Sequence, residues 1–562
     1  MPGLFGYTKN THCNDESIVI EMRRLFTHNS FHIADEIFSN DDIAASRVHI
    51  NVIQKEKQPH TQNGIYIWLD GEFYNQPDLL KNSECIGDAA LLQQLYCEDN
   101  SLDFLKKIDG IFIAVIYDSI KKKLHLISDR HGLRQIFWTN INNAFFWFSE
   151  IKAVLAIRNF PLIIEQDAIN SFLTKEYLTG DSAWFKNVFL LNPATVLTWD
   201  ISSQKVTQQQ YWSWNNIAPV AGIVNEKDMI EELAYLFKNA VAKRADAGRI
   251  GITLSGGLDS RALLAALPSG INPVCATFGK ENCDDIQIAK MVAKKKNTRQ
   301  VIFELTGEKW ITSCFKSVWA TDGQSKLTDM HGTAFAADFR QLFDVNLSGF
   351  LGDAFFGGGY FRLIQSTLLN VYLNRGRRRI LMFVKSFDNF IHNRLPFLDN
   401  DLMNFFIKYI NYPKIESGAI YHKMLLQQFP EYYKKIPWQE TGLPINASAG
   451  RLFLKRVENK IGRELPFLPI QNNNKDYCDY PLWASTEPAK SVFIKLLTNP
   501  DNLYQNYLDK NIVLNKLNMF MSKPEQDTNY GIINYLSRIL TIEIWLQQFF
   551  NNKYREGFVF DE

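Results

Sequence analysis

The stretch Leu254-Ser255-Gly256-Gly257-Leu258-Asp259-Ser260-Arg261 connects an apolar run at residues 249–254, which predicts a β-strand, to a helix predicted to begin near Ser260. Its two adjacent glycines let the backbone turn tightly and bring N–H groups close to an anion. The N-terminus of the following helix adds positive potential at the same place. Asp259 would repel a bare polyphosphate, so its presence implies an intervening Mg²⁺ held through oxygen ligands. We therefore predict a phosphate-binding loop between a strand and a helix.

The residue order of this loop excludes two other nucleotide-binding patterns. The Gly-Lys-Ser/Thr ending of a Walker loop is absent, and so is the G-x-G-x-x-G dinucleotide fingerprint. A Gly-Gly turn can be purely structural, but the order Ser-Gly-Gly-x-Asp-Ser resembles the pyrophosphate-binding loop of ATP enzymes that release AMP and pyrophosphate. We predict ATP and Mg²⁺ as cofactors. The predicted cofactor-binding residues are Leu254, Ser255, Gly256, Gly257, Leu258, Asp259, Ser260, Thr277, Phe278, Ser348 and Gly349.

The sequence pattern divides the chain into two domains, which we place at residues 1–215 and 216–562. In the second domain, strands alternate with helices, and this alternation predicts a parallel sheet that is followed by a mostly helical part after residue 360. The first domain has clustered strands with a turn at Asp70-Gly71, which predicts two layered sheets. The predicted strands are 65–69, 110–118, 124–128, 144–149, 249–254, 273–278 and 300–304, and the predicted helices are 89–96, 226–245 and 285–295.

Composition and charge exclude several classes of protein. The chain has 562 residues, of which 46% are hydrophobic and 22% charged, as in a soluble protein of more than one domain. A formal net charge of +1 gives no support to nucleic-acid binding. No run approaches the roughly 20 apolar residues that cross a bilayer, and no secretory segment precedes the first strands. We expect a cytoplasmic protein with neither a nucleic-acid partner nor a membrane partner.

Two further features of the composition are informative. The seven cysteines are scattered and contain no CxxC pair, so a disulfide framework or a structural zinc site is not expected. The run Arg375, Arg377, Arg378 and Arg379 is locally basic. We interpret it as a solvated helix face or as a contact for an acidic substrate or partner.

The order of several motifs over about residues 1–470 resembles asparagine synthetase and its relatives. The resemblance implies an α/β plus α fold, with a front Ntn-hydrolase-like β-sandwich flanked by helices. It also implies an ATP-pyrophosphatase-like parallel sheet with a large helical extension. The front domain resembles a class II glutamine amidotransferase. Its matching segments are residues 70–75, Gly87-Asp88, 109–112, 128–132 and 148–152. In the second domain the matching segments are residues 255–260, 348–353, Phe356-Gly357-Gly358 and 394–399.

The front domain departs from this family at two positions. Glutaminases of the family use an N-terminal cysteine thiolate to form an acyl-enzyme, but Pro2 stands there and Cys13 is too far along the chain. The family's oxyanion donor is an amide side chain, but Asp70 stands there. An ionised carboxylate would repel the developing negative oxygen, where the donor it replaces is worth roughly 3–4 kcal/mol. We predict no glutamine hydrolysis.

The second domain also departs from the family. Asp353 matches an acid that holds Mg²⁺-pyrophosphate with Asp259, although such an acid can also cap a helix. Phe350 stands where ammonia-using synthetases place a glutamate base, and phenylalanine cannot accept a proton. The alternative is a register shift near Leu351, since Gly359 indicates an insertion. We predict Asp259 and Asp353 as metal ligands and catalytic residues, and Phe350, Arg261 and Gly352 as the substrate pocket.

Three other positions carry weaker predictions from the same resemblance. Glu440 stands where the family has a lysine that stabilises the adenylation transition state, so we predict that Lys434 or Lys435 substitutes for it. Arg261 follows the phosphate loop and either contacts a phosphate or carboxylate or pairs with a neighbouring acid. Aromatic residues in the second domain suit either core packing or a peptide-binding chamber. These are Phe383, Phe387, Phe390, Tyr421, Trp438, Trp483 and Trp545.

The resemblance implies that a carboxylate is activated as an acyl-adenylate and attacked by an amine. Relatives that lack both the glutaminase and the ammonia base are the β-lactam synthetases and the lasso-peptide cyclases, and we expect the lasso-type macrolactam cyclase. The substrate would be a peptide or a small carboxylate, and a protease and a leader-peptide-binding protein would be partners. Two alternatives remain, an intermolecular amide ligase that uses ammonia or another amine and a non-catalytic nucleotide-binding scaffold.

Overall fold

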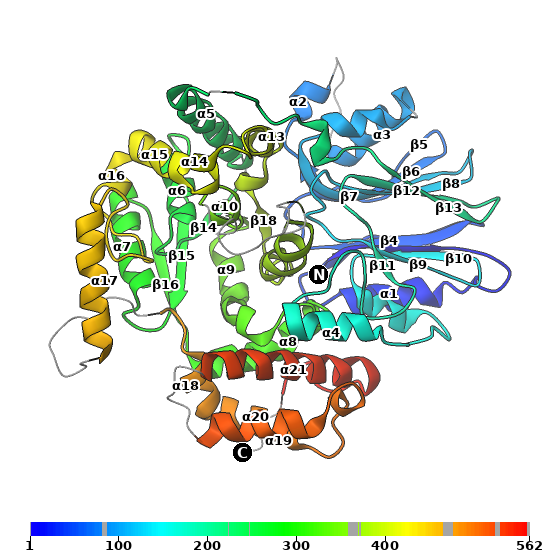
Figure 1. The fold of residues 1–562 in the computed structure, drawn as a ribbon. Helices are drawn as coiled ribbons and strands as arrows, with labels where there is room; N and C mark the ends of the chain where they lie inside the picture. The colour runs from blue at the N-terminus through cyan, green and yellow to red at the C-terminus, as the bar shows by residue number, and fades with distance from the viewer. Residues whose placement is uncertain are drawn as a thin grey trace.

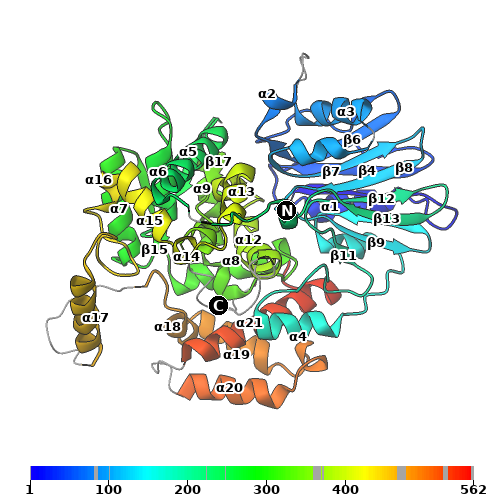
Figure 2. The same ribbon diagram turned by 45° about the horizontal axis from the view of Figure 1, so that its top comes forward.

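The computed structural model describes residues 2–80, 87–99, 101–222, 224–246, 248–357, 369, 372–464, 476–522 and 529–558. Gly358, which belongs to one of the matching segments, lies outside the described residues, as does Cys85. The front domain and the second domain lie side by side, with the C-terminal helices below both (Figures 1 and 2).

Two antiparallel sheets, packed face to face, form the front domain. The first sheet consists of β1 (Gly3–Thr8), β2 (Ile33–Ala34), β3 (Phe38–Ser39), β4 (Ile43–His49), β9 (Phe137–Ile141), β10 (Ala144–Phe148) and β11 (Phe189–Leu190). The second consists of β5 (His60–Gln62), β6 (Ile65–Phe73), β7 (Gly110–Asp118), β8 (Lys123–Ser128), β12 (Thr195–Asp200) and β13 (Lys205–Gln210). The orders are β11-β9-β10-β1-β4-β2, with β3 on β4, and β13-β12-β8-β7-β6-β5.

The core between these sheets is aromatic, and helices cover both outer faces. Trp68, Trp147, Phe145 and Trp199 are buried between the sheets because alternate side chains of each strand point inward. Figure 1 shows the resulting order of helix, sheet, sheet and helix, which confirms the predicted layered sandwich. The covering helices are α1 (Ser17–Phe26), α2 (Gln76–Leu79), α3 (Asp88–Glu98) and α4 (Gln166–Lys175), with the short 3₁₀ turns η1 (Asp103–Lys107) and η2 (Ile151–Ala156).

The predicted turn at Asp70-Gly71 is wrong. Both residues lie inside β6, where Asp70 is paired with Ile113 and Gly71 with Phe112. Gly71 has a φ of +127°, and a side chain there would collide with the carbonyl oxygen of Ile111. The glycine therefore permits close strand pairing within a continuous strand instead of ending it.

The second domain is built on a five-stranded parallel sheet of order β16-β15-β14-β17-β18, as the alternating pattern predicts. Its strands are β14 (Ile250–Thr253), β15 (Val274–Gly279), β16 (Gln300–Glu304), β17 (Val345–Leu347) and β18 (His392–Arg394). The helices that connect and cover them are α5 (Glu226–Arg244), α6 (Asp259–Ala266), α7 (Asp284–Lys296), α8 (Gly307–Ala320), α9 (Ala336–Leu342), α10 (Gly352–Phe355) and α12 (Leu381–Lys385). The strand order reverses at β14: β15 and β16 lie on one side of it, and β17 and β18 lie on the other.

Most of the remaining described chain is helical. Helices α18, α19 and α21 pack against α8, α20 packs against α19 and α21, and α21 also packs against α4 of the front domain. The elements are α13 (Asn400–Lys408), α14 (Pro413–Glu416), α15 (Ala419–Gln428), α16 (Pro430–Tyr433), α17 (Ala449–Glu464), α18 (Tyr480–Ser485), α19 (Ala489–Thr498), α20 (Lys510–Ser522) and α21 (Asn529–Phe550). Shorter turns are η3 (Trp214–Asn216), η4 (Leu327–Asp329), η5 (His331–Phe335), η7 (Pro396–Leu398), η8 (Tyr504–Asn506) and the π-helical segment η6 (Tyr372–Ile380). The predicted boundary at 215/216 falls in η3, between β13 and α5.

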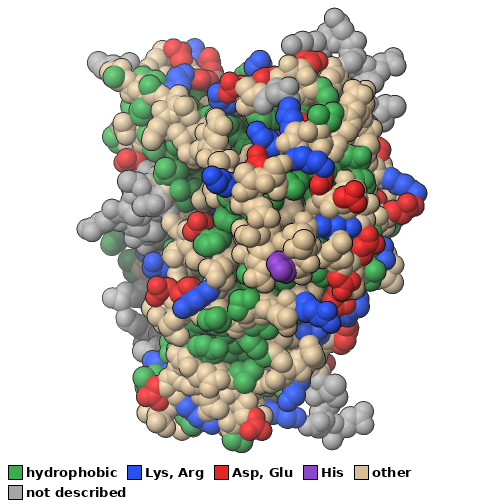
Figure 3. Space-filling model, turned by 90° about the vertical axis from the view of Figure 1, so that its right-hand side faces the viewer, with side chains coloured by type: hydrophobic (Ala, Val, Ile, Leu, Met, Phe, Trp, Pro, Cys, Tyr) green, Lys and Arg blue, Asp and Glu red, His purple; other side chains and the backbone are tan. Residues whose placement is uncertain are grey.

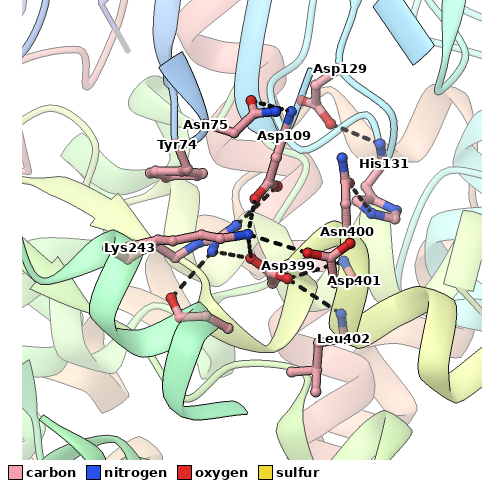
Figure 4. Close-up of polar contacts among 12 residues, drawn as sticks. Tyr74, Asn75, Asp109, Asp129, His131, Lys243, Asp399, Asn400, Asp401 and Leu402 are labelled. Atoms are coloured by element: carbon pink, nitrogen blue, oxygen red, sulfur yellow. Dashed lines mark hydrogen bonds and ion pairs between the residues drawn. The ribbon is translucent and has the colours of Figure 1, made fainter. Parts of the chain in front are cut away.

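A buried charged network joins the two domains (Figure 4). Arg244 on α5 donates to Asp399 at 2.6 Å and to Asp109 of the front domain at 3.4 Å. Lys243 lies 3.3 Å from Asp109 and 3.4 Å from Asp401. Burial raises the pKa of Asp109 above its usual value. Burial would also raise the pKa of Asp399, but Arg244 and Lys243 hold it below its usual value.

The basic run at residues 375–379 belongs to the same domain interface. Arg379 forms ion pairs with Glu176 at 2.7 Å and Asp329 at 3.2 Å, whereas for Arg377 and Arg378 neither interpretation made from the sequence is correct. Arg377 and Arg378 are 2% and 1% exposed. Arg377 donates to the carbonyl oxygen of Gly132 at 2.9 Å, and Arg378 donates to that of Gly180 at 2.7 Å. Backbone carbonyls of the front domain, rather than acidic groups, therefore satisfy these guanidinium groups.

The surface of the front domain carries charges of both signs. Figure 3 shows Lys and Arg side chains interspersed with Asp and Glu side chains, with a hydrophobic patch towards the lower part of this face. Among the described residues, no helix is both long and apolar enough to cross a bilayer.

Candidate active site

The predicted phosphate loop lies at the carboxyl end of β14, at the point where the strand order reverses. In open α/β sheets, ligands bind at this switch point. A cavity of about 720 Å³ opens there. It is lined by eleven of the residues that the sequence predicts for the site: Leu254, Ser255, Gly257, Leu258, Asp259, Ser260, Phe278, Ser348, Gly349, Phe350 and Asp353. The structure therefore brings these eleven predicted residues together around one cavity.

Hydrogen bonds within the loop hold its backbone N–H groups in place. The N–H of Ser255 donates to Oγ of Ser260 at 3.1 Å, and the N–H of Gly257 donates to Oγ of Ser255 at 3.2 Å. The N–H of Gly256 donates to Asp285 Oδ1 at 2.8 Å. Asp285, in the first turn of α7, is a residue that the sequence analysis did not assign to the site. Paired acids at the start of that predicted helix were the only signal for it.

Asp259 and Asp353 meet at the edge of this loop. The backbone N–H of Asp353 donates to Asp259 Oδ2 at 2.6 Å, and the Tyr421 hydroxyl donates to Asp259 Oδ1 at 2.8 Å. Burial and the neighbouring charge of Asp353 raise the pKa of Asp259 to about 7. The two acids therefore disfavour each other's charge, and a bound cation would relieve this repulsion.

Glycines permit the close approach of α10 to the loop. A side chain at Gly352 would come within 2.5 Å of the Asp259 carboxyl carbon, and one at Gly349 within 2.8 Å of the Ser260 backbone nitrogen. Gly352 does not line the cavity itself. Its predicted place in the substrate pocket is therefore wrong. The absence of a side chain at Gly352 instead leaves room for the Asp259 carboxylate.

The donor set at this edge fits Mg²⁺. Within the described part of the chain, no group of three or more His, Cys, Asp or Glu residues could hold a metal ion by itself. Magnesium, however, is commonly bound through one or two carboxylates together with substrate phosphates and water. Asp259 and Asp353, which both line the cavity beside the phosphate loop, supply two such carboxylates.

The rest of the cavity is largely aromatic. Phe350, Phe383, Phe387 and Tyr421 line it, as does Trp438. The backbone N–H of Gln439 donates to the carbonyl oxygen of Gly256 at 3.3 Å, and this bond holds the Trp438 segment against the phosphate loop. Other aromatic residues that the sequence analysis considered for a chamber do not line the cavity and pack in the core instead: Phe390, Trp483 and Trp545.

Arg261 does not face the cavity, so its predicted place in the substrate pocket is wrong. Its side chain is fully buried and donates to backbone carbonyl oxygens: to Pro437 at 2.8 Å, to Gly256 at 3.1 Å and to Ile436 at 3.3 Å. A guanidinium offers five donors in a fixed plane, which suits several carbonyls at once. Arg261 therefore fastens the chain after α16 to the phosphate loop.

Four other predicted residues also lie outside the cavity lining. Lys434 and Lys435 are exposed just after α16 and do not line the cavity, so the structure does not bring them to the site. Gly256 is buried in the loop without lining the cavity. The Thr277 hydroxyl donates to the Leu254 carbonyl at 2.9 Å and so supports the loop from behind.

A second, much smaller cavity of about 20 Å³ lies between the domains, lined by Pro2 and Asp70 of the front domain and by Asp388 and His392 of the second. Asp70 forms an ion pair of 2.9 Å with Arg134, which also contacts Nδ1 of His392 at 3.0 Å. Cysteine, serine and threonine are absent from the described residues that line this cavity. The positions matched to the family's nucleophile and oxyanion donor are therefore occupied by a proline and by an ion-paired carboxylate.

Comparison with known proteins matches both domains. The family model for the glutamine amidotransferase domain matches residues 1–212, and the family model for asparagine synthase matches residues 232–385. These two matches and the folds described above define a class of protein in which a glutamine amidotransferase domain precedes a synthetase domain. The chain belongs to the asparagine synthetase superfamily.

Individual relatives are distant and are matched over part of their length. Asparagine synthetase [glutamine-hydrolyzing] 2 of Bacillus subtilis (strain 168) is 26% identical over 57% of this chain and 47% of its own. Putative asparagine synthetase [glutamine-hydrolyzing] 2 of Methanocaldococcus jannaschii is 28% identical over 36% of this chain and 40% of its own. The probable asparagine synthetase of Acanthamoeba polyphaga mimivirus is 25% identical over 66% of this chain and 70% of its own. The chain thus spans about half the length of the first two relatives.

Proposed function

We propose that the protein is an ATP-dependent carbon–nitrogen ligase that activates a carboxylate as its adenylate and joins it to an amine. The observation that carries this proposal is the meeting of Asp259 and Asp353 beside the phosphate loop, at 2.6 Å between the Asp353 nitrogen and Asp259 Oδ2. Family membership supports the same reaction class. Mg²⁺ would neutralise the phosphates and the leaving pyrophosphate at this edge.

The chain's own residues would position the reactants. The N-terminus of α6, which begins at Asp259, favours an anion at the loop. Asp259 and Asp353 would hold the cation, and Tyr421 fixes the orientation of Asp259 through its hydrogen bond of 2.8 Å. The carboxylate substrate attacks the α-phosphorus of ATP, its oxygen forms the new bond, and pyrophosphate leaves with the electrons of the broken bond.

The amine that completes the reaction is best supplied by the substrate itself. Phe350 lines the cavity where the family places its ammonia base, and phenylalanine cannot accept a proton. A tethered amine reaches a very high effective concentration, on the order of 10⁵–10⁸ M in well-oriented cases. We therefore propose macrolactam closure of a ribosomal peptide, of the lasso-peptide cyclase type, in the cytoplasm. A protease and a leader-peptide-binding protein would then be its partners.

Glutamine hydrolysis is not part of the proposed activity. Pro2 offers no nucleophile, and Asp70 is held in its ion pair with Arg134 at 2.9 Å. A carboxylate at that position would repel a developing oxyanion. The front domain would then have a structural role only, and would support the second domain through the interface that includes Arg244 and Asp399.

Two measurements test the proposal. ATP–pyrophosphate exchange that depends on an added acid would establish adenylation, and the variant Asp259→Ala should abolish it. Incubation with ATP, Mg²⁺ and the nearest encoded short peptide, followed by mass spectrometry, would then identify the product. Loss of one water from a single peptide supports macrolactam closure, whereas condensation of two molecules supports the intermolecular ligase. Absence of exchange with every acid and peptide would favour the non-catalytic scaffold.

A further inference from the structure

The cavity at the phosphate loop is lined by acids but not by basic side chains. Among the described residues that line it there is no lysine or arginine. Five of the lining residues are acids: Asp259, Asp285, Asp353, Glu440 and Asp476. A nucleotide would add the negative charge of its phosphates to the same space, and a bound Mg²⁺ would balance part of that charge. A positive side chain that acts on the phosphates therefore has to lie behind the cavity wall.

Arg261 is a buried cation directly behind this wall. Its side chain is fully buried, and its Nη2 donates to the carbonyl oxygen of Gly256 at 3.1 Å. That carbonyl belongs to the peptide unit that joins Gly256 to Gly257, and Gly257 lines the cavity, as do the three residues immediately before Arg261. The guanidinium thus touches the back of the same loop whose front faces the cavity.

The charge of Arg261 has no acidic partner in the described part of the chain. Its acceptors are four backbone carbonyl oxygens, those of Gly256, Tyr432, Ile436 and Pro437. Burial lowers its pKa, and no carboxylate is among the groups that oppose this shift. Because an arginine stays protonated even when it is buried, an unbalanced positive charge remains behind the loop.

We infer that Arg261 is an electrostatic positioning residue whose charge is balanced by the phosphates of the bound nucleotide, across the peptide unit between Gly256 and Gly257. Burying a cation without a counter-ion is unfavourable, and an anion in the loop offsets part of that cost. The attraction is stronger than in water because protein, rather than solvent, lies between the two charges. This inference rests on the proposed adenylation. It goes beyond the fastening of the chain after α16, which needs hydrogen-bond donors but no charge.

Binding of inorganic pyrophosphate tests this role of the charge. Pyrophosphate is titrated against the full chain in the presence of Mg²⁺, with isothermal titration calorimetry as the readout. Arg261→Lys keeps the positive charge, Arg261→Gln keeps an amide donor without the charge, and Arg261→Met keeps only an unbranched apolar side chain. We expect both neutral variants to bind pyrophosphate at least about tenfold more weakly than the unchanged chain, and Arg261→Lys to bind within about threefold of it. Two neutral variants are used so that loss of the fold in one leaves the other to decide.

The control is Arg377→Gln, which should leave the affinity for pyrophosphate unchanged. Arg377 is also buried and also donates to backbone carbonyls, but these belong to Gly132 and Leu191 of the front domain, and Arg377 does not line the cavity. Equal losses in Arg261→Lys and Arg261→Gln, or full affinity in the neutral variants, overturn the inference. Acid-dependent ATP–pyrophosphate exchange by the unchanged chain is read separately. If that exchange occurs, either result leaves the proposed function standing, whereas an unchanged chain that neither exchanges nor binds pyrophosphate contradicts the proposed function itself.

Discussion

Arg134 and Asp70 form a half-buried ion pair, 2.9 Å between Nη1 and Oδ2, at the small cavity between the two domains. The same guanidinium contacts His392 at the start of β18 in the second domain. The position that the family uses for an oxyanion donor is thus tied into the domain interface. At this position the structure has an ion pair that links the two domains.

This pairing predicts that a single restored nucleophile will not restore glutaminase activity. The variant Pro2→Cys should release no more glutamate from glutamine than the unchanged chain, because Asp70 would still oppose an oxyanion and Arg134 would still fill the cavity. Glutamate is measured with a coupled dehydrogenase assay. The matched variant Pro219→Cys, at an exposed position outside this cavity, provides the background. Glutamate release by either the unchanged chain or Pro2→Cys above that background would contradict our interpretation of the front domain.

A second prediction concerns the pair of acids at the phosphate loop. Asp259→Asn or Asp353→Asn should reduce acid-dependent ATP–pyrophosphate exchange by about 10²–10³-fold, the size expected when one preorganised electrostatic contact to a transition state is lost. The fold should be retained, since both side chains lie at the cavity edge and an amide preserves their shape.

The control for these two variants is Asp228→Asn, an exposed carboxylate in the first turn of α5. It should leave exchange unchanged, and circular dichroism should show the same secondary structure for all three variants. Retention of full exchange in Asp353→Asn would show that Asp259 acts without the partner that we assign to it.

Local patterns in the sequence predict the strands and helices around the loop because those elements are specified by short-range periodicity. The strand at residues 300–304 and the strand at residues 110–118 have the predicted bounds. The loop itself is predicted because its glycines and Asp259 lie within a few residues of one another. Its chemistry can therefore be read without knowledge of distant contacts.

Distant contacts explain where the sequence analysis was wrong or silent. Arg378 looks exposed in a basic run, but its acceptors are backbone oxygens of the front domain, and any sequence can supply a carbonyl. Arg261 is buried for the same reason, through carbonyls near residue 437. Tyr421 reaches Asp259 from 162 positions along the chain, so no local spacing marks it. Only the packing of the helices brings such groups together.

A third prediction concerns the interface between the domains. Glu72 of β6 accepts hydrogen bonds from Arg394 at 2.6 and 2.5 Å and contacts His392 at 2.7 Å. Burial alone would raise the pKa of Glu72, but His392 and Arg394 hold it well below its usual range. Removing one partner of such a buried group leaves uncompensated charge, which costs about 3–5 kcal/mol.

We therefore expect Glu72→Gln to lower the free energy of unfolding by several kcal/mol, measured by urea denaturation. The control is Glu36→Gln, whose ion pair with Lys57 at 3.2 Å lies in solvent, with both side chains at least 85% exposed. An exposed pair of this kind contributes about 0–1 kcal/mol. Similar losses in the two variants would show that the Glu72 cluster does not hold the domains together.

The last prediction concerns acid sensitivity in the front domain. His125 is buried, with Nδ1 at 2.8 Å from the Thr198 hydroxyl and Nε2 at 3.3 Å from the Tyr96 hydroxyl. Burial lowers its pKa from 6.5 to about 4. The unfolded chain therefore takes up this proton first as the pH falls. The contribution of His125 to stability is lost between pH 6.5 and 4, with a slope on the order of 1 kcal/mol per pH unit.

Other buried groups act in the opposite direction, so the test compares slopes between variants. Burial raises the pKa of Asp129 to about 6, and the folded state then takes up that proton first, which stabilises it on acidification. We expect His125→Gln to remove about 1 kcal/mol per pH unit from the slope of unfolding free energy between about pH 6.5 and 4.5. Urea midpoints at several pH values measure that slope. His12→Gln, at an exposed position, should leave it unchanged, and an unaltered slope in His125→Gln would mean that this imidazole is already protonated in the folded protein.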